Sequence, residues 1–216
     1  MNALIFANGT CRRNRTLSLL AKQADLIIAA DGGANHCEKL RLTPDMLIGD
    51  LDSIDPGLLL RYEKSGMTIE RHPQKKDATD LELALDLAVE QGFGKVHICG
   101  ALGGRWDMSI ANIVLCASRK YRSTSIILLG KDCTISILHP GTLHKIAGPP
   151  GKTVSLIPLR KEAKGVTLHG FEYPLEDAKI AFGSSLGLSN VLLAECGTVR
   201  LKSGVLALVV FSRPKT

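Results

Sequence analysis

The chain has 216 residues, of which 45% are apolar, 22% charged and only 4% aromatic, and its formal net charge is +6. This is ordinary globular composition, which excludes global disorder, and the few aromatic residues argue against a protein that stacks single-stranded bases on exposed rings. The apolar runs are far shorter than the roughly 20 residues of a membrane-spanning helix, and the run at Met1–Ala7 is too short for a signal peptide.

The first part of the chain contains short, continuous apolar runs. Such runs are typical of strands that are buried on both faces of a sheet. We predict strands at Ala3–Ala7, Leu26–Ala30, Met46–Ile48, Met67–Glu70, Lys95–Cys99 and Ile126–Leu129. Helix-like stretches separate several of them, so residues 1–130 are predicted to form an α/β domain with an open, mostly parallel sheet flanked by helices.

Three helices are predicted in this domain, at 56–64, 80–91 and 107–120. The first begins with Pro56, which suits a first helical turn. The second is preceded by Thr79, and Glu82 stands three residues later at capping-box spacing.

From residue 131 the helical periodicity fades and strand-like runs follow at close intervals. These runs are Thr134–Leu138, Thr142–Ile146, Thr153–Pro158, Lys179–Phe182, Val191–Ala194, Thr198–Leu201 and Val205–Phe211. Gly and Pro separate them, as in all-β domains, so residues 131–216 are predicted to form a β-sandwich.

The net positive charge of the chain comes from its second part. Residues 1–120 hold 15 basic and 15 acidic residues, whereas residues 121–216 hold 12 and 6. A basic half is compatible with a nucleic acid or another anionic ligand. The only dense cluster, Arg160, Lys161 and Lys164, lacks aromatic neighbours, and we interpret it as a solvated loop.

The six cysteines are scattered and include no Cys-x-x-Cys pair, so no zinc site is expected. We interpret them as small buried hydrophobic residues of a cytoplasmic, reducing environment.

Six aspartates follow strands or precede a helix of the predicted sheet. They are Asp31, Asp50, Asp52, Asp77, Asp80 and Asp107. Each alone could be a turn or cap residue, but the carboxyl ends of parallel strands share one edge, where ligands bind. Carboxylates crowded there repel one another, and a hard cation such as Mg²⁺ together with substrate phosphates would relieve the repulsion.

Glycine-rich turns lie at the same predicted edge. Gly32 and Gly33 follow Asp31, and Gly103 and Gly104 precede Arg105. Glycine allows close approach of backbone N–H groups to phosphate oxygens, although neither turn matches a dinucleotide or P-loop fingerprint. Arg105 could bind a phosphate with two hydrogen bonds, or it could pair with a neighbouring aspartate.

Together these segments resemble the thiamine pyrophosphokinase family. The matching segments are Asn8-Gly9, residues 30–35, Gly49-Asp50-Leu51-Asp52-Ser53, Lys76-Asp77-Ala78-Thr79-Asp80, residues 100–107, and Gly187-Leu188-Ser189-Asn190. They stand in the family's order along nearly the whole chain.

The resemblance implies Mg²⁺-dependent transfer of pyrophosphate from ATP to the hydroxyl of thiamine, giving AMP and thiamine diphosphate. It also implies an ATP-binding first domain, a thiamine-binding second domain, and a homodimer with its active sites at the interface. By the same resemblance Asp50, Asp52 and Asp80 hold the metal, and Asp52, Asp80, Arg105 and Asp107 are catalytic. The residues implied to bind the substrates are Asn8, Gly9, Asp31, Gly32, Gly33, Asp77, Thr79, Gly103, Gly104, Ser189 and Asn190.

Two positions depart from the family's usual pattern. Met108 stands where the family usually has His, and Leu188 where it often has Thr. The second departure concerns the acceptor pocket, so a pyrophosphokinase that acts on a hydroxymethyl pterin is kept as an alternative. The alternative from a different class is a non-catalytic nucleotide- or nucleic-acid-binding protein, which the sequence pI of about 9.1 suggests.

Overall fold

The computed structural model describes residues 1–214, which form two compact units. The first comprises Met1–Leu115 and Ser123–Lys131, and the second comprises Cys116–Arg122 and the chain from Asp132 onward.

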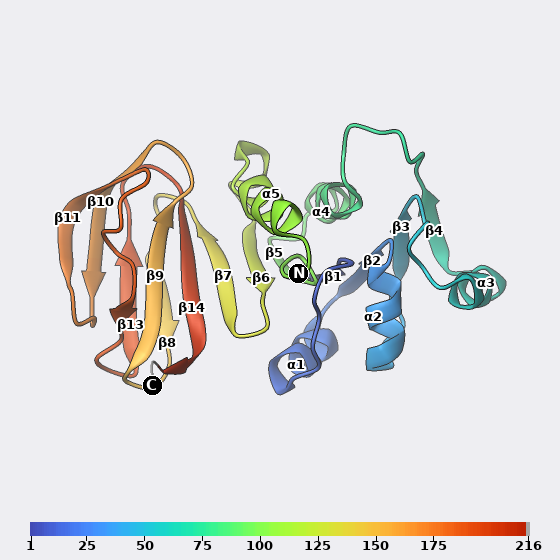
Figure 1. The fold of residues 1–216 in the computed structure, drawn as a ribbon, viewed down its shortest axis with the longest axis horizontal. Coiled ribbons are helices and arrows are strands. Elements are labelled where there is room, and N and C mark those ends of the chain that lie inside the picture. The colour runs from blue at the N-terminus through green and yellow to red at the C-terminus, as the bar shows by residue number, and fades with distance from the viewer. Residues whose placement is uncertain (215–216) are drawn as a thin grey trace. The chain divides into compact units, whose positions relative to one another are not determined.

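The first unit is built on a parallel sheet of six strands (Figure 1). The strands are β1 (Asn2–Phe6), β2 (Leu26–Ala30), β3 (Met46–Gly49), β4 (Thr68–Arg71), β5 (Lys95–Cys99) and β6 (Ser125–Leu129). Their order in the sheet is β6-β5-β1-β2-β3-β4, and every neighbouring pair is parallel. All six predicted strands are confirmed, because near-continuous burial in β1, β2 and β5 produces the apolar runs that predicted them.

Five helices accompany this sheet. They are α1 (Arg15–Gln23), α2 (Gly33–Leu40), α3 (Pro56–Lys64), α4 (Asp80–Glu90) and α5 (Trp106–Cys116). Figure 1 shows α1, α2 and α3 on one side of the strands and α4 and α5 on the other. Among the described residues, none of the helices is long and apolar enough to cross a membrane.

The helix predictions at 56–64 and 80–91 are confirmed together with their starts. Asp55 caps α3 by accepting from Leu58 N at 2.9 Å, and Thr79 Oγ1 caps α4 by accepting from Glu82 N at 3.2 Å. The third prediction was too long, because α5 ends at Cys116 and a separate 3₁₀ turn, η1 (Arg119–Tyr121), follows.

Helices α1 and α2 were not predicted. In α1 the only buried residue is Leu17, but Leu17, Leu20 and Ala21 recur at helical spacing, so the sequence carried a helical pattern that the prediction did not use. The start of α1 is also marked by Asn14, whose Oδ1 accepts from Leu17 N at 2.7 Å. In α2 the chain enters the helix through Gly32 and Gly33, which are poor helix formers.

The second unit is a β-sandwich of two antiparallel sheets. Its strands are β7 (Cys133–Leu138), β8 (His144–Ala147), β9 (Lys152–Pro158), β10 (Glu162–His169), β11 (Leu175–Ala181), β12 (Asn190–Val191), β13 (Cys196–Arg200) and β14 (Leu206–Pro214). Strands run in the order β12-β9-β14-β7 in one sheet and β11-β10-β13-β8 in the other. A shared core that includes Leu156, Leu208, Val166 and Val199 joins the two sheets, which confirms the predicted sandwich.

The interpretation of the basic cluster as a solvated loop is wrong for Lys164. This residue lies in β10, which was not predicted. A register shift between Ala163 and Val166, at Gly165 with φ of 66°, breaks the alternation of buried and exposed residues that would have identified the strand. Lys164 pairs with Glu162 at 2.8 Å, and Lys179 also reaches Glu162, so part of the positive charge of this unit is neutralised locally.

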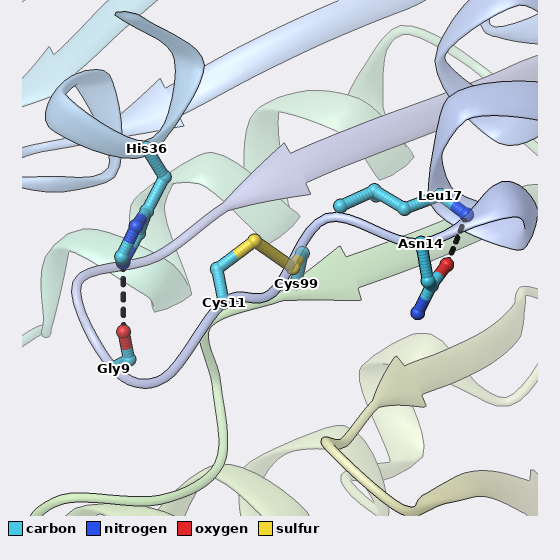
Figure 2. The surroundings of a disulfide bond; sticks show 6 residues. All are labelled: Gly9, Cys11, Asn14, Leu17, His36 and Cys99. Atoms are coloured by element: carbon cyan, nitrogen blue, oxygen red, sulfur yellow. Dashed lines mark hydrogen bonds between the residues drawn. A yellow bond between two sulfur atoms is a disulfide. The ribbon is translucent and has the colours of Figure 1, made fainter. Parts of the chain in front are cut away.

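A disulfide joins Cys11 to Cys99, with Cα atoms 5.8 Å apart (Figure 2). The expectation that all six cysteines are simple buried thiols is therefore wrong for this pair, and it is also wrong for Cys196, which is exposed. Ala7 N donates to Cys99 O at 2.8 Å, which brings the loop after β1 to the end of β5 although the two cysteines are 88 residues apart. Cys37 and Cys116 are buried, as predicted, and burial raises the pKa of each thiol to about 12.

The buried His97 on β5 predicts a loss of stability in acid. Only 7% of this residue is exposed, and burial, assisted by Lys95, lowers its pKa from 6.5 to about 4. As the pH falls, the unfolded chain therefore takes up the His97 proton at a higher pH than the folded protein does. The free energy of unfolding is unaffected by this proton above pH 6.5 and decreases as the pH falls toward 4. At about pH 5 this loss amounts to about 2 kcal/mol.

We expect His97→Gln to remove most of that acid sensitivity. The free energy of unfolding is to be measured by urea titration near pH 7.5 and near pH 5 for the wild type and the variant. His169→Gln is the matched control, because the His169 side chain is 67% exposed. An equal pH dependence in His97→Gln and the wild type would show that His97 does not cause it.

Candidate active site

A cavity of about 550 Å³ lies at the carboxyl edge of the parallel sheet in the first unit. Loops after β1, β2, β3 and β5 line it, together with the segment before α4, as expected for a ligand site of an open α/β sheet. The sequence-predicted residues among its lining are Asn8, Gly9, Asp31, Asp50, Asp52, Thr79, Asp80, Gly103, Gly104 and Arg105. The fold thus brings together residues that are up to 97 positions apart in the chain, from Asn8 to Arg105.

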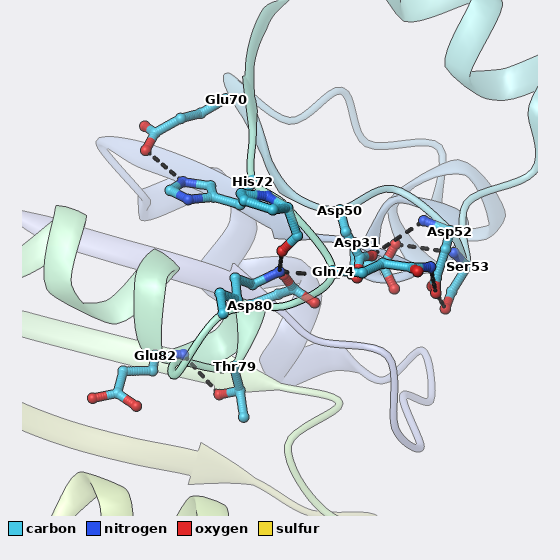
Figure 3. Close-up of polar contacts among 12 residues, drawn as sticks. Asp31, Asp50, Asp52, Ser53, Glu70, His72, Gln74, Thr79, Asp80 and Glu82 are labelled. Atoms are coloured by element: carbon cyan, nitrogen blue, oxygen red, sulfur yellow. Dashed lines mark hydrogen bonds and ion pairs between the residues drawn. The ribbon is translucent and has the colours of Figure 1, made fainter.

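Three carboxylates of the cavity lining lie close together (Figure 3). Asp31, Asp50 and Asp52 each offer an oxygen, and these oxygens all lie within 4.8 Å of one another. Asp31 is only 6% exposed and has the left-handed φ of 47°, and its Oδ1 accepts from Ser53 N at 3.1 Å. Asp31 therefore fixes the loop that carries Asp50 and Asp52. The predicted metal ligands were Asp50, Asp52 and Asp80, whereas the three oxygens that lie together belong to Asp31, Asp50 and Asp52.

Asp80 lies next to this group, in the first turn of α4. A side chain at Gly49 would meet Asp80 Oδ1 at 2.9 Å and Asp31 Cβ at 3.2 Å, so both aspartates pack over the same glycine. Lys76 Nζ forms an ion pair with Asp80 Oδ1 at 2.9 Å, and this buried oxygen has no other polar partner within the described residues. Four carboxylates that share one lysine ammonium group fit a hard divalent cation.

The glycines allow the loops around the cavity to approach closely. Gly9 N donates to Gly100 O at 2.7 Å, and Gly100 has φ of 76° and leaves no room for a side chain beside Ala7 O. Gly33 packs directly on Phe6 O and Gly32 on the Asn8 side chain. Gly32 and Gly33 are not among the lining residues, so their visible role is to hold α2 against the loop after β1.

Arg105 forms a two-point pair with Asp107 at the rim of the cavity. Its Nε and Nη2 donate to the two carboxylate oxygens at 3.1 and 2.5 Å, and both side chains are more than half exposed. These hydrogen bonds lower the pKa of Asp107 and raise that of Arg105. Arg105 lines the cavity, whereas Asp107 does not.

Three further predicted residues are not among the lining residues of this cavity. Asp77 is exposed and is not among the lining residues. Ser189 and Asn190 belong to the second unit, where a hollow of about 310 Å³ is lined by Tyr173, Leu175, Ser185, Leu186, Gly187, Leu188 and Asn190. Asn190 is only 3% exposed, and its amide bonds the Tyr173 backbone in both directions, at 2.7 and 3.0 Å. The amide thus anchors one wall of this 173–190 hollow.

The sequence analysis did not assign roles to four polar residues that line the cavity, which are Ser53, Gln74, Lys76 and Asn112. Gln74 Nε2 donates to Asp52 Oδ2 at 2.9 Å, and Asn112 Nδ2 donates to Ala101 O at 2.8 Å. Ser53 and Lys76 stand inside the segments that carried the family resemblance, and this was the signal that could have identified them.

A cavity lined by carboxylates and glycine turns at the carboxyl edge of a parallel sheet is typical of enzymes that act on phosphate-containing substrates. Comparisons with known proteins narrow this class. Residues 17–128 match the family model "Thiamin pyrophosphokinase, catalytic domain", and residues 142–206 match "Thiamin pyrophosphokinase, vitamin B1 binding domain".

Individual proteins agree with these matches. The chain is 33% identical to a thiamine pyrophosphokinase of Bacillus subtilis (strain 168) over 184 residues, which are 85% of this chain and 86% of that protein. The crystal structure of a B. subtilis thiamine pyrophosphokinase superposes with a TM-score of 0.84 at 30% identity, covering 98% of this chain and 99% of that one. The crystal structure of a thiamin pyrophosphokinase from Geobacillus thermodenitrificans superposes with a TM-score of 0.83 at 27% identity, covering 99% of this chain and 98% of that one. The chain therefore belongs to the thiamine pyrophosphokinase family and is an enzyme of that family.

Proposed function

We propose that this enzyme transfers a pyrophosphoryl group from ATP to the hydroxyl of thiamine in a Mg²⁺-dependent reaction that releases AMP. The observation that carries the proposal is the carboxylate group Asp31, Asp50 and Asp52, with Asp80 beside it, in a cavity of a chain from this family. In the reaction the thiamine hydroxyl oxygen attacks the β-phosphorus of ATP and releases its proton to solvent. The bond from that phosphorus to the α–β bridging oxygen breaks, and AMP leaves with that oxygen.

The residues of the cavity fit the demands of this transfer. Asp50 and Asp52, with Asp80 and the buried Asp31, would hold Mg²⁺, which neutralises phosphate charge when it is bound. The loops that contain Gly9, Gly103 and Gly104 allow close approach of phosphate oxygens to the backbone. Little covalent work is left to the protein, so positioning and charge supply most of the acceleration.

Arg105 and Asp107 are assigned different tasks. Arg105 lines the cavity and offers a planar pair of donors to a phosphate. Asp107 has a pKa lowered by Arg105, which makes it a weak base, so we assign it to orienting Arg105 and not to accepting the thiamine proton.

The 173–190 hollow is the proposed place for part of thiamine. It falls within the residues that match the vitamin B1 binding family model. Asn190 would act by fixing Tyr173, and Ser189, whose left-handed φ is 54°, is exposed beside it. The exposed apolar side chains of this hollow, including Leu186 and Leu188, suit the rings of thiamine better than the hydroxyl group that accepts the pyrophosphate.

A homodimer is also proposed. Trp106, Ile110 and Val114 stand at successive four-residue intervals on α5 and are 81%, 59% and 56% exposed. Such an apolar stripe is costly in water and suits a surface that a second copy covers. Light scattering is the measurement that tests this. A cytoplasmic location stays a prediction from the sequence.

The reaction is tested by incubating the purified protein with ATP, Mg²⁺ and thiamine and separating the products. We expect AMP and thiamine diphosphate in equal amounts. ADP with thiamine monophosphate would contradict pyrophosphoryl transfer. A hydroxymethyl pterin in place of thiamine tests the alternative acceptor, and salt-sensitive DNA binding without any ATP turnover would support the non-catalytic alternative.

A further inference from the structure

We propose that Lys76 is the internal counter-ion of the cavity carboxylates in the free enzyme and a phosphate-binding residue in the complex with ATP. The proposed function assigns roles to other residues of the cavity and leaves Lys76 without one. The second half of the proposal rests on the proposed function, because it requires ATP to occupy the cavity.

Lys76 lies on the segment between β4 and α4 and reaches into the cavity. Its Nζ lies 2.9 Å from Asp80 Oδ1 and 3.9 Å from Asp50 Oδ2, and it donates to Pro73 O at 3.1 Å. Only 14% of its side chain is exposed. A lysine held this far from water loses hydration and rotamer freedom, and the ion pairs with Asp50 and Asp80 are what offsets that loss.

The charges around Lys76 are out of balance. Asp31, Asp50, Asp52 and Asp80 bring four negative charges to the cavity if all are ionised. Among residues 1–212, whose side chains the structure describes, Lys76 is the one basic residue that forms an ion pair with any of them. One ammonium group relieves part of the repulsion and leaves enough negative charge to attract a divalent cation.

Lys76 and such a cation cannot both stay close to the same oxygens. Asp50 is a contact of Lys76 and also a member of the three-carboxylate group. At about 4 Å, like charges repel by several kcal/mol at an effective dielectric constant of about 20. Lys76 has a flexible four-carbon stem and three donors, so it can leave the carboxylates and remain in the cavity, where a phosphate oxygen of ATP is the anion available to it.

The test compares Lys76→Met with Lys75→Met, which removes the same charge from the exposed neighbouring residue. The first measurement is Mn²⁺ binding to the nucleotide-free protein by electron paramagnetic resonance. We expect Lys76→Met to bind Mn²⁺ about fivefold more tightly than the wild type, because a repelling charge is gone. The second measurement is ATP binding by calorimetry in saturating Mg²⁺, which we expect to weaken about tenfold. Lys75→Met should change neither affinity by more than about twofold.

Opposite shifts of the two affinities distinguish this proposal from a purely structural role. If Lys76 only holds its loop in place, Lys76→Met would bind both Mn²⁺ and ATP more weakly. Its melting temperature would then fall, and added Mg²⁺ would not restore it. Unchanged ATP affinity in Lys76→Met would overturn the phosphate-binding role, and unchanged Mn²⁺ affinity would overturn the counter-ion role. Lys76→Arg, which keeps the charge, should recover most of the ATP affinity.

These outcomes are separate from those for the proposed function. A wild-type protein that binds ATP but makes no thiamine diphosphate would contradict the proposed function, while the two affinities would still decide the role of Lys76. Normal production of thiamine diphosphate together with unchanged affinities in Lys76→Met would overturn the Lys76 proposal alone.

Discussion

Replacing Asp52 by Asn is expected to lower turnover by at least about 100-fold, because the loss of one carboxylate weakens the hold on Mg²⁺ and on the phosphates it neutralises. Asp52 is exposed at the cavity, and its carboxylate accepts from Ser53 Oγ at 2.8 Å and from Gln74 Nε2 at 2.9 Å. Asn can keep one of these hydrogen bonds at nearly the same shape. Without metal, the removal of one repelling charge should leave the melting temperature level or higher.

The ligand-induced change in melting temperature separates this role from that of a turn residue. A ligand at 100 times its dissociation constant stabilises the native state by about 2.7 kcal/mol, so weaker binding of Mg²⁺ and ATP shrinks the shift. Asp55→Asn is the matched control, since Asp55 caps α3 outside the cavity and Asn is an equally good cap. Near-normal turnover of Asp52→Asn at saturating Mg²⁺ would contradict a metal-binding role and leave Asp52 a turn residue.

The parallel sheet was predictable because its strands are local, apolar and continuous. The positions of Asp31, Asp50, Asp52 and Asp80 at one edge followed from that sheet, since each comes after a strand or at the start of a helix. The sandwich was predictable as a class, but β10 was not, because the register shift at Gly165 interrupts its pattern. Strand and helix patterns describe burial along one segment and fail where a segment is irregular.

The arrangement of side chains in the site depends on contacts between distant segments. No local signal distinguishes Asp31, which is buried in the carboxylate group, from Asp77, which is exposed. The same holds for Lys76, whose role depends on Asp50, a residue that only the fold brings within 3.9 Å. Cys11 and Cys99 are likewise joined by the pairing of β1 with β5, and their spacing alone gave no indication of it.

Arg105→Lys is expected to lower turnover by about 10- to 100-fold while leaving stability nearly unchanged. The variant keeps the positive charge but loses the planar pair of donors that can bind two oxygens at once. The pair with Asp107 lies in water, with side chains 74% and 62% exposed, so it contributes little to the stability of the fold. A large loss of rate therefore cannot arise from unfolding.

Steady-state kinetics and thermal melting of the same preparations check this prediction. Arg61→Lys is the matched control, because Arg61 pairs with Glu38 at 2.6 Å on an equally exposed surface away from the cavity. If Arg105 binds phosphate, only Arg105→Lys should lose turnover, and the loss should persist at saturating ATP, because an interaction that strengthens in the transition state affects kcat as well as KM. If both variants keep their turnover, the pair with Asp107 is a surface ion pair and Arg105 has no part in the transfer.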